Sequence, residues 1–383
     1  MTEYLLSTKK TADYLGVSVS TIYRMEEQGI LHPIKTVGGQ RRFNKSELDS
    51  YKEKSKTFVA PQKPYQLSGE KMTVEKNDSI SNTNEENEEL NLSNFDENPN
   101  KPVDPRNTLN DLNGSQWMPE TKSFLYQRGL GSKHPHAQIE RQHPAPYSFQ
   151  DISHLIAFFT KKGMSVLDPF GGVGSTAKAS EILGRKCTSI ELQQKWHNLA
   201  IERLETEIGL GASKNHSFIQ GDSRNVLRQI DDASFDFVVT SPPYWSILNK
   251  KADHKVKQER LSNNLATNYS DNDVNDLANI KSYDEFLNVL VNDIFLECAR
   301  VLKPKKYMAL VVSDFRNKSE YVSFHSDLIQ RLNKANTPDG YHIYLAGTKI
   351  LIQNHKSLLP YGYPFAYVEN IHHQYILIFR KDR

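Results

Sequence analysis

The chain has 383 residues, of which 37% are hydrophobic and 25% charged, a composition typical of a folded protein in water. Its length allows two or three domains of about 150 residues each. The 48 Lys and Arg residues nearly balance the 46 Asp and Glu residues, for a net charge of +2. Two cysteines, Cys187 and Cys298, exclude a disulfide framework and lack zinc-finger spacing, so we expect a cytoplasmic protein without a structural metal. The absence of long apolar runs and of a signal peptide predicts no association with a membrane.

The first element pattern lies near the N-terminus. Residues 8–15 are predicted to form a short amphipathic helix, residues 16–18 a turn, and residues 20–28 a second helix that ends at Gly29. This is the pattern of a helix-turn-helix. The second helix presents side chains that can reach phosphates and base edges, namely Ser20, Thr21, Tyr23 and Arg24.

A predicted hairpin follows at residues 35–43, where Gly38 and Gly39 form the turn and Arg41 and Arg42 come directly after it. Such a hairpin is typical of a basic wing that lies against a DNA backbone. Together these features resemble the MerR-like, excisionase-type DNA-binding domain, which we assign to residues 1–58 and which implies double-stranded DNA as a partner. The alternative is a protein-docking module whose two arginines lie in a solvated turn.

A polar segment separates this domain from the rest of the chain. Residues 61–115 carry 5 Lys and Arg residues against 11 Asp and Glu residues, and they are rich in Asn, Glu and Ser. Such a composition buries too little apolar surface to offset the conformational entropy lost on folding. We therefore predict a disordered acidic linker over residues 59–111.

Strand-like and helix-like segments alternate over residues 112–383, which predicts an α/β fold with a Rossmann-like, doubly wound, mostly parallel sheet. Two late apolar segments, residues 343–353 and 367–379, are expected to pair as an antiparallel hairpin at the sheet edge. The expected parallel strands are residues 164–168, 186–192, 216–220, 235–240 and 307–312, and the expected helices are residues 176–183, 195–207, a segment near 225, and 284–301.

The first expected strand leads into a glycine-rich loop, Asp168–Thr176. Three glycines allow a ligand to approach the backbone closely, beside the free N–H groups of a helix start. The loop lacks the dinucleotide fingerprint and the P-loop lysine, which argues against NAD and ATP. The second and third strands end at Glu191 and Asp222, positions suited to a ribose hydroxyl pair and an adenine amino group. Each carboxylate taken alone is more often a solvated loop residue or a helix cap, but their register with the glycine loop favours the role in binding.

The fourth strand ends in Thr240–Trp245, sequence Thr-Ser-Pro-Pro-Tyr-Trp. The prolines fix the backbone and leave carbonyl acceptors free, Ser241 adds a hydroxyl acceptor, and Tyr244 an aromatic face. This set can hold a planar ring and accept hydrogen bonds from its exocyclic amino group. The alternative is a Pro-Pro turn that only closes the strand.

The glycine loop followed by Ser241–Tyr244 resembles the S-adenosylmethionine-dependent DNA methyltransferases that modify an exocyclic amino group, over residues 112–383. The resemblance implies a class I methyltransferase fold, S-adenosyl-L-methionine as cofactor, and no catalytic metal. It implies the catalytic set Ser241, Pro242, Pro243 and Tyr244. It also implies cofactor contacts from Asp168, Phe170, Gly171, Gly172, Gly174, Ser175, Thr176, Glu191 and Asp222, and from His143 and Pro144 in the segment His143–Tyr147, which looks like the family's extra cofactor motif.

The serine at position 241 resembles the group that modifies cytosine N4, with adenine N6 second. Carbon-5 methylation is disfavoured because it needs a nucleophilic thiolate, and neither cysteine follows a proline as in that group. We therefore expect a site-specific DNA methyltransferase that acts on DNA in the cytoplasm, with a cognate restriction endonuclease as a further partner. Two alternatives stay open: an RNA amino-methyltransferase, and a DNA-binding regulator that uses S-adenosylmethionine only as a ligand.

Overall fold

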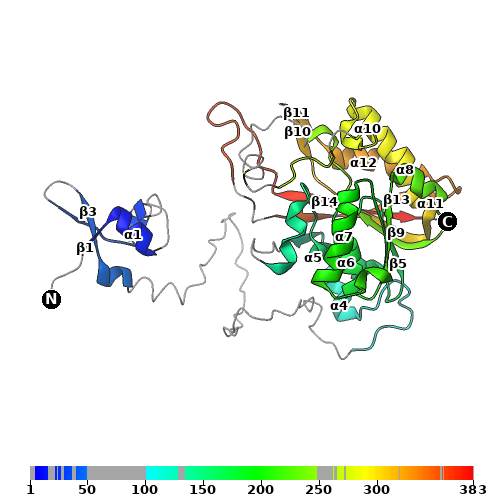
Figure 1. The fold of residues 1–383 in the computed structure, drawn as a ribbon, viewed down its shortest axis with the longest axis horizontal. Helices are drawn as coiled ribbons and strands as arrows, with labels where there is room; N and C mark the ends of the chain where they lie inside the picture. The colour runs from blue at the N-terminus through cyan, green and yellow to red at the C-terminus, as the bar shows by residue number, and fades with distance from the viewer. Residues whose placement is uncertain are drawn as a thin grey trace, which may run out of the picture. The chain divides into compact units, whose positions relative to one another are not determined.

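The computed structural model describes residues 5–15, 22–23, 25–26, 30–36, 40–49, 101–127, 134–247, 262, 265–270, 273–318, 320–353, 356 and 358–382. The chain divides into two compact units, one within residues 1–84 and one within residues 85–383 (Figure 1). Each unit has its own core and is described by itself. In the described part of the chain, no helix has both the length and the apolar character needed to cross a membrane.

The N-terminal unit is a small sheet packed against helices. Strands β1 (Leu5–Ser7), β3 (Arg41–Asn44) and β2 (Ile34–Lys35) pair antiparallel in that order, and α1 (Thr8–Leu15) follows β1 directly. The β2–β3 pair is the predicted hairpin. Its core consists of buried apolar side chains from the helical and strand segments: Ala12, Ile22, Met25, Leu31, Phe43 and Leu48.

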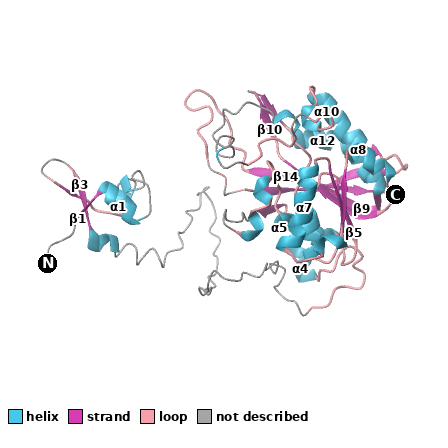
Figure 2. Cartoon of the chain, in the orientation of Figure 1, coloured by secondary structure: helices cyan, strands magenta, loops and turns pink. Residues whose placement is uncertain are grey.

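The C-terminal unit is built on a nine-stranded sheet, shown in magenta in Figure 2. The strands run in the order β12 (Ala335–Asn336), β13 (His342–Ile352), β14 (His373–Lys381), β9 (Leu302–Val312), β8 (Phe235–Thr240), β5 (Ser165–Asp168), β6 (Lys186–Glu191) and β7 (Ser217–Gln220), and β4 (Phe124–Tyr126) pairs with β13. Strands β7, β6, β5, β8 and β9 are parallel, whereas β14 is antiparallel to both of its neighbours. The predicted Rossmann-like, mostly parallel sheet is confirmed.

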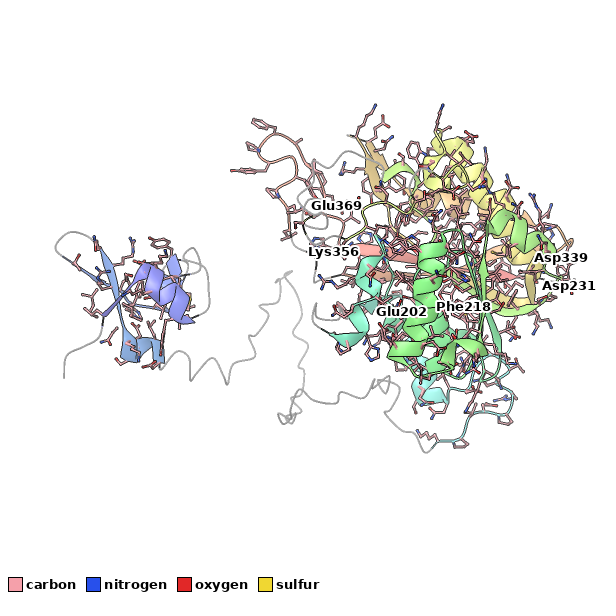
Figure 3. The ribbon with its side chains drawn as sticks, in the orientation of Figure 1. Glu202, Phe218, Asp231, Asp339, Lys356 and Glu369 are labelled. Carbon is pink, nitrogen blue, oxygen red and sulfur yellow. The ribbon has the colours of Figure 1, made fainter. Side chains whose placement is uncertain are left out.

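Alternate residues of a strand point to opposite faces of the sheet. Apolar side chains lie on both faces here, and helices cover each of them. Val238 and Leu310 belong to an apolar cluster with α11 (Leu296–Val301) and α12 (Phe324–Leu332). Phe237 and Val311 belong to a second cluster with α5 (Phe149–Phe159). All six residues of β8 are buried, as expected for a central strand with helices on both sides. Figure 3 labels Phe218, on the outermost parallel strand β7.

Three predictions differ from the structure in detail. The predicted helix at 284–301 is α10 (Tyr283–Val289), a π-helix η7 (Leu290–Phe295) and α11, and apolar periodicity gave no sign of the wider middle turn. The predicted hairpin of β13 and β14 does not end the sheet, because β4 pairs parallel with β13, Ile350 facing Phe124. A short strand pair, β10 (Phe315–Asn317) and β11 (Glu320–Val322), was not predicted.

The last part of the predicted disordered linker instead packs on the C-terminal unit. The Asn110 side chain is fully buried and its Nδ2 donates to the Phe158 carbonyl oxygen at 2.6 Å. Asp111 Oδ2 accepts from Lys162 N at 2.7 Å. The polar side chains that suggested disorder form local turns here, since Asn107 Oδ1 accepts from the backbone of Leu109 at 3.0 Å. Asn110 and Asp111 therefore belong to the C-terminal unit rather than to a linker.

Candidate active site

A pocket lies at the carboxyl ends of the parallel strands, the edge where ligands bind in sheets of this kind. Parallel strands bring the segments that follow them to one sheet edge, so the loops after β5, β6, β7 and β8 all contribute to the lining. The residues predicted from sequence that line it are His143, Phe170, Gly171, Gly172, Ser175, Glu191, Asp222, Ser241, Pro242 and Pro243.

The glycine loop forms one wall because no side chain fits there. A Cβ at Gly171 would lie 1.9 Å from Ser189 Oγ on β6. Gly171 N donates to the Ile190 carbonyl oxygen at 2.8 Å, which holds the loop against β6. Gly174 has a φ of 77° and is the N-cap of α6 (Ser175–Ile182), a backbone conformation that favours glycine.

Five predicted site residues are absent from the pocket lining, namely Asp168, Gly174, Thr176, Pro144 and Tyr244. Asp168 is completely buried, and its carboxylate accepts from Thr240 Oγ1 at 2.6 Å, Tyr147 OH at 2.6 Å and Thr176 Oγ1 at 2.5 Å. Burial raises the pKa of Asp168, although these donors oppose the shift. The structure thus places Asp168 behind the pocket, where it ties the glycine loop to the end of β8.

Glu191 lies in the pocket at the end of β6. Its Oε2 accepts from Gly172 N at 2.9 Å and its Oε1 accepts from Gln193 N at 2.8 Å. Burial raises the pKa of Glu191 to about 7, and the negative charges of Asp168 and Asp276 contribute to the rise. Glu191 is therefore a carboxyl group whose charge changes near neutral pH.

Asp222 reaches the pocket from the start of α8 (Ser223–Val226). It is the N-cap of that helix, where its Oδ1 accepts from Arg224 N at 2.9 Å. The Arg224 guanidinium also pairs with the carboxylate, with Nη2 at 2.5 Å from Oδ2. Asp222 thus combines the expected position with an ion pair that neutralises its charge.

The Ser-Pro-Pro-Tyr segment divides between the pocket and the core. Ser241, Pro242 and Pro243 line the pocket, but the Tyr244 ring packs edge-on against Phe324, with centroids 6.3 Å apart. The Tyr244 hydroxyl accepts from Gln374 Nε2 at 3.0 Å. Tyr244 is therefore partly buried against the core, and its role as an aromatic face for the target base stays a prediction.

Of the 25 residues that line the pocket, 15 are not among the site residues predicted from sequence. Residues 265–270 and 273–280, which we call the strap, carry no motif, and they reach the pocket only through the tertiary fold. Ile294 lies on the π-helix, which the sequence does not reveal. The additional lining residues are Ala145, Pro146, Tyr147, Pro169, Val173, Ile190, Leu192, Gln193, Trp196, Ser223, Tyr269, Asn275, Asp276, Leu277 and Ile294.

A buried arginine fastens the segment that carries His143 to the glycine loop. Arg203, on α7 (Gln194–Glu207), is fully buried. Its Nη1 donates to Ser175 Oγ at 3.0 Å and its Nη2 donates to Glu140 Oε2 at 2.6 Å. Because Ser175 lines the pocket and Glu140 precedes His143, Arg203 holds two walls of the pocket together.

The structure describes three residues of the predicted DNA-binding set, namely Tyr23, Arg41 and Arg42. The Tyr23 side chain is exposed, and the Arg41 guanidinium lies over its ring at 5.2 Å from the centroid. Arg41 Nε also donates to Glu26 Oε2 at 2.7 Å, and Arg42 Nη2 donates to Gln40 Oε1 at 3.1 Å. The predictions for Ser20, Thr21 and Arg24 fall outside the described residues.

Known proteins match the chain in parts. A family model described as a helix-turn-helix domain matches residues 5–56. A relative named "Putative methylase YubD", from Escherichia coli strain K12, is 39% identical over 64 residues, which are 17% of this chain and 28% of that protein. The chain thus spans less than a third of the length of this curated relative.

Solved structures also resemble the chain. TrmN from Thermus thermophilus gives a TM-score of 0.38 at 17% identity, over 67% of this chain and 54% of TrmN. A "Putative DNA Modification Methylase", also from Thermus thermophilus and complexed with S-adenosyl-L-methionine, gives a TM-score of 0.27 at 25% identity. The match covers 43% of this chain and 54% of that protein. A "putative rRNA-methylase" from Clostridium thermocellum gives a TM-score of 0.36 at 13% identity. The match covers 62% of this chain and 98% of that protein.

Proposed function

We propose that the chain is a DNA methyltransferase that transfers a methyl group from S-adenosyl-L-methionine to an exocyclic amino group of a base, cytosine N4 in preference to adenine N6. One observation carries the proposal. Ser241, Pro242 and Pro243 line the same pocket as the glycine loop and Glu191, so acceptors suited to an amino group lie beside a cradle suited to a nucleoside cofactor.

The residues present fit this cofactor. The missing side chain at Gly171 lets the loop lie against β6, because a Cβ there would collide with Ser189, and the loop backbone lines the pocket. Glu191 offers acceptor oxygens for a ribose hydroxyl pair, and Phe170 offers an apolar face. When bound, S-adenosylmethionine supplies an electrophilic methyl group.

The residues of the chain would act mainly by positioning. The Ser241 hydroxyl and the carbonyl oxygens of the Ser-Pro-Pro segment accept hydrogen bonds from the target amino group and aim its nitrogen at the methyl carbon. Such preorganised acceptors lower the barrier because they need no rearrangement during reaction.

Duplex DNA is the proposed substrate because the helix-turn-helix match at residues 5–56 lies in the same chain as the pocket. The target base must leave the duplex, at a cost of a few kcal/mol, because a stacked base cannot reach a pocket. The preference for cytosine N4 rests on the serine at position 241. A cognate restriction endonuclease would cut the same sequence only when it is unmethylated.

Base-resolved methylation sequencing tests the proposal, with genomic DNA from a methylation-free host that expresses the chain. We expect N4-methylcytosine at one sequence motif, lost on Ser241→Ala. The matched control is Ser234→Ala. Ser234 comes just before β8, at the end of the strand away from Ser241, and its Oγ donates to the Asp231 carbonyl oxygen at 2.7 Å. N6-methyladenine would correct the base and keep the activity. Unmodified DNA beside methylated RNA would overturn the DNA assignment.

A further inference from the structure

The strap, residues 265–270 and 273–280, closes one side of the pocket. Its contribution consists of Tyr269, Asn275, Asp276 and Leu277. Hydrogen bonds attach it to three neighbouring elements: Trp196 Nε1 donates to Tyr269 O at 2.9 Å, Arg224 Nη2 to Asn275 O at 3.2 Å, and Trp245 Nε1 to Ile280 O at 2.8 Å. The strap is therefore a fixed wall, and its side chains help to define which ligand the pocket accepts.

The pocket carries an excess of negative charge. Three carboxylates line it, those of Glu191, Asp222 and Asp276, while no Lys or Arg occurs among the described lining residues. Arg224 offsets the charge of Asp222. Glu191 is only partly ionised at neutral pH, because burial and the nearby carboxylates raise its pKa to about 7.

Asp276 differs from the other two carboxylates. Its neighbours are neutral donors: Oδ1 accepts from Ala278 N at 2.9 Å and Oδ2 accepts from Ser270 Oγ at 2.6 Å. In the described part of the chain, no Lys or Arg nitrogen lies within ion-pair distance of Asp276. Only 7% of the surface of Asp276 is exposed, so water screens its charge only weakly.

We propose that Asp276 makes the pocket select the positively charged cofactor over its neutral product. The inference rests on the proposed function. S-adenosylmethionine carries a sulfonium, an ammonium and a carboxylate, for a net charge of +1. In the transfer the amine lone pair forms the new N–C bond, the S–C bond electrons return to sulfur, and the methylated amine gives a proton to the solvent. The product is an uncharged thioether at sulfur with no net charge, so Asp276 attracts it less and favours its release.

The variant Asp276→Asn removes the charge and keeps the local structure. Asp276 is the N-cap of the 3-10 helix η6 (Leu277–Asn279), and Asn serves as well as Asp at that position. Asp273→Asn is the matched control on the same strap. Asp273 accepts from Gln193 Nε2 at 2.9 Å and from Asn275 N at 2.9 Å, but it does not line the pocket.

Isothermal titration of the full chain measures Kd for three ligands: S-adenosylmethionine, S-adenosylhomocysteine, and sinefungin, in which an amine-bearing carbon replaces the sulfonium and restores the charge of +1. We expect Asp276→Asn to weaken the two cationic ligands about tenfold, as removal of one charge in a partly dry site implies. S-adenosylhomocysteine should change less than about twofold, since it has no net charge. Asp273→Asn should leave the ratio of the three affinities unchanged.

Equal weakening of all three ligands would make Asp276 a structural cap only, and unchanged affinities would show that its charge does not select; either result overturns the inference and leaves the proposed function intact. Failure of the unmodified chain to bind any of the three ligands would instead overturn the proposed function, and the inference with it.

Discussion

Glu191 shows how one buried carboxyl group links ligand binding to pH. Its pKa is raised to about 7 because burial disfavours its charged form. Ribose hydroxyls donate hydrogen bonds, so they favour the ionised carboxylate over the protonated form. Binding of the cofactor should therefore release a proton from Glu191 when the solution is below pH 7.

We predict that the affinity for S-adenosylmethionine rises about tenfold between about pH 5.5 and pH 7.5, as the carboxyl group with a pKa of about 7 ionises. Titration calorimetry at several pH values measures the slope, and Glu191→Gln should remove it. Glu202→Gln is the control, because Glu202 is an exposed carboxylate on α7, labelled in Figure 3. The same slope in the Glu191→Gln variant would assign the titration to another group.

The same shift predicts a gain in stability when this charge is removed. The pKa of Glu191 in the folded chain lies above its ordinary value of 4.5, so the folded state loses stability as the pH rises from that value through about 7. Glu191→Gln should therefore raise Tm at pH 8 and leave it little changed at pH 4. Thermal unfolding at both pH values checks this, and a lower Tm at pH 8 would contradict it.

At the scale of the element, the glycine loop is shaped by β6 as much as by its own sequence. We predict that Gly171→Ala costs about 1–3 kcal/mol of unfolding free energy, a range typical of overpacking, and weakens cofactor binding. The cause is the 1.9 Å approach of the new Cβ to Ser189 Oγ. Denaturant unfolding and ligand titration measure the two effects.

The control for this variant is Gly114→Ala, at the first position of α4 (Gly114–Glu120), where a Cβ meets no atom within 4 Å. Alanine is a better helix former than glycine, so this variant should keep or slightly raise stability. Adding Ser189→Ala to Gly171→Ala should restore part of the loss. A Gly171→Ala variant as stable and as active in binding as the parent chain would refute the steric account.

Sequence patterns predicted the strands and the glycine loop because each depends on residues close together in the chain. The strand ends fixed the positions of Glu191 and Asp222, and both reach the pocket. The strap could not be predicted, since Tyr269 and Asp276 lie far in sequence from the loops they face. The orientation of Tyr244 also could not, because it depends on Phe324 and Gln374 from the last part of the sheet unit.

At the scale of the whole molecule, the division into two compact units predicts that DNA binding and cofactor binding can be separated. A fragment that starts at residue 101 should bind the cofactor as the full chain does, and methylate DNA less efficiently. A fragment that starts at residue 112 should unfold at a lower temperature, because it lacks the contacts of Asn110 with Phe158 and of Asp111 with Lys162. Thermal unfolding with and without cofactor separates the two fragments; equal Tm values would refute a structural role for residues 101–111.

The N-terminal unit should contribute through charge. We predict that the double variant Arg41→Ala, Arg42→Ala binds DNA more weakly at low salt. The slope of log K against log salt concentration should become less steep by about two. Arg41 is already oriented by Glu26 and Tyr23, so little ordering is needed on binding. Fluorescence anisotropy at several salt concentrations measures the slope, and an unchanged slope would place DNA contacts elsewhere.

The position of β14 has a consequence for the order in which the protein forms. Among the described strands β14 is the last to be synthesised, yet it lies inside the sheet, between β9 and β13. Until it emerges from the ribosome, β9 and β13 have no strand between them, and Gln374 cannot reach the Tyr244 hydroxyl. The N-terminal unit needs no later segment for its core. During translation, the helix-turn-helix unit can thus fold well before the pocket of the C-terminal unit is complete.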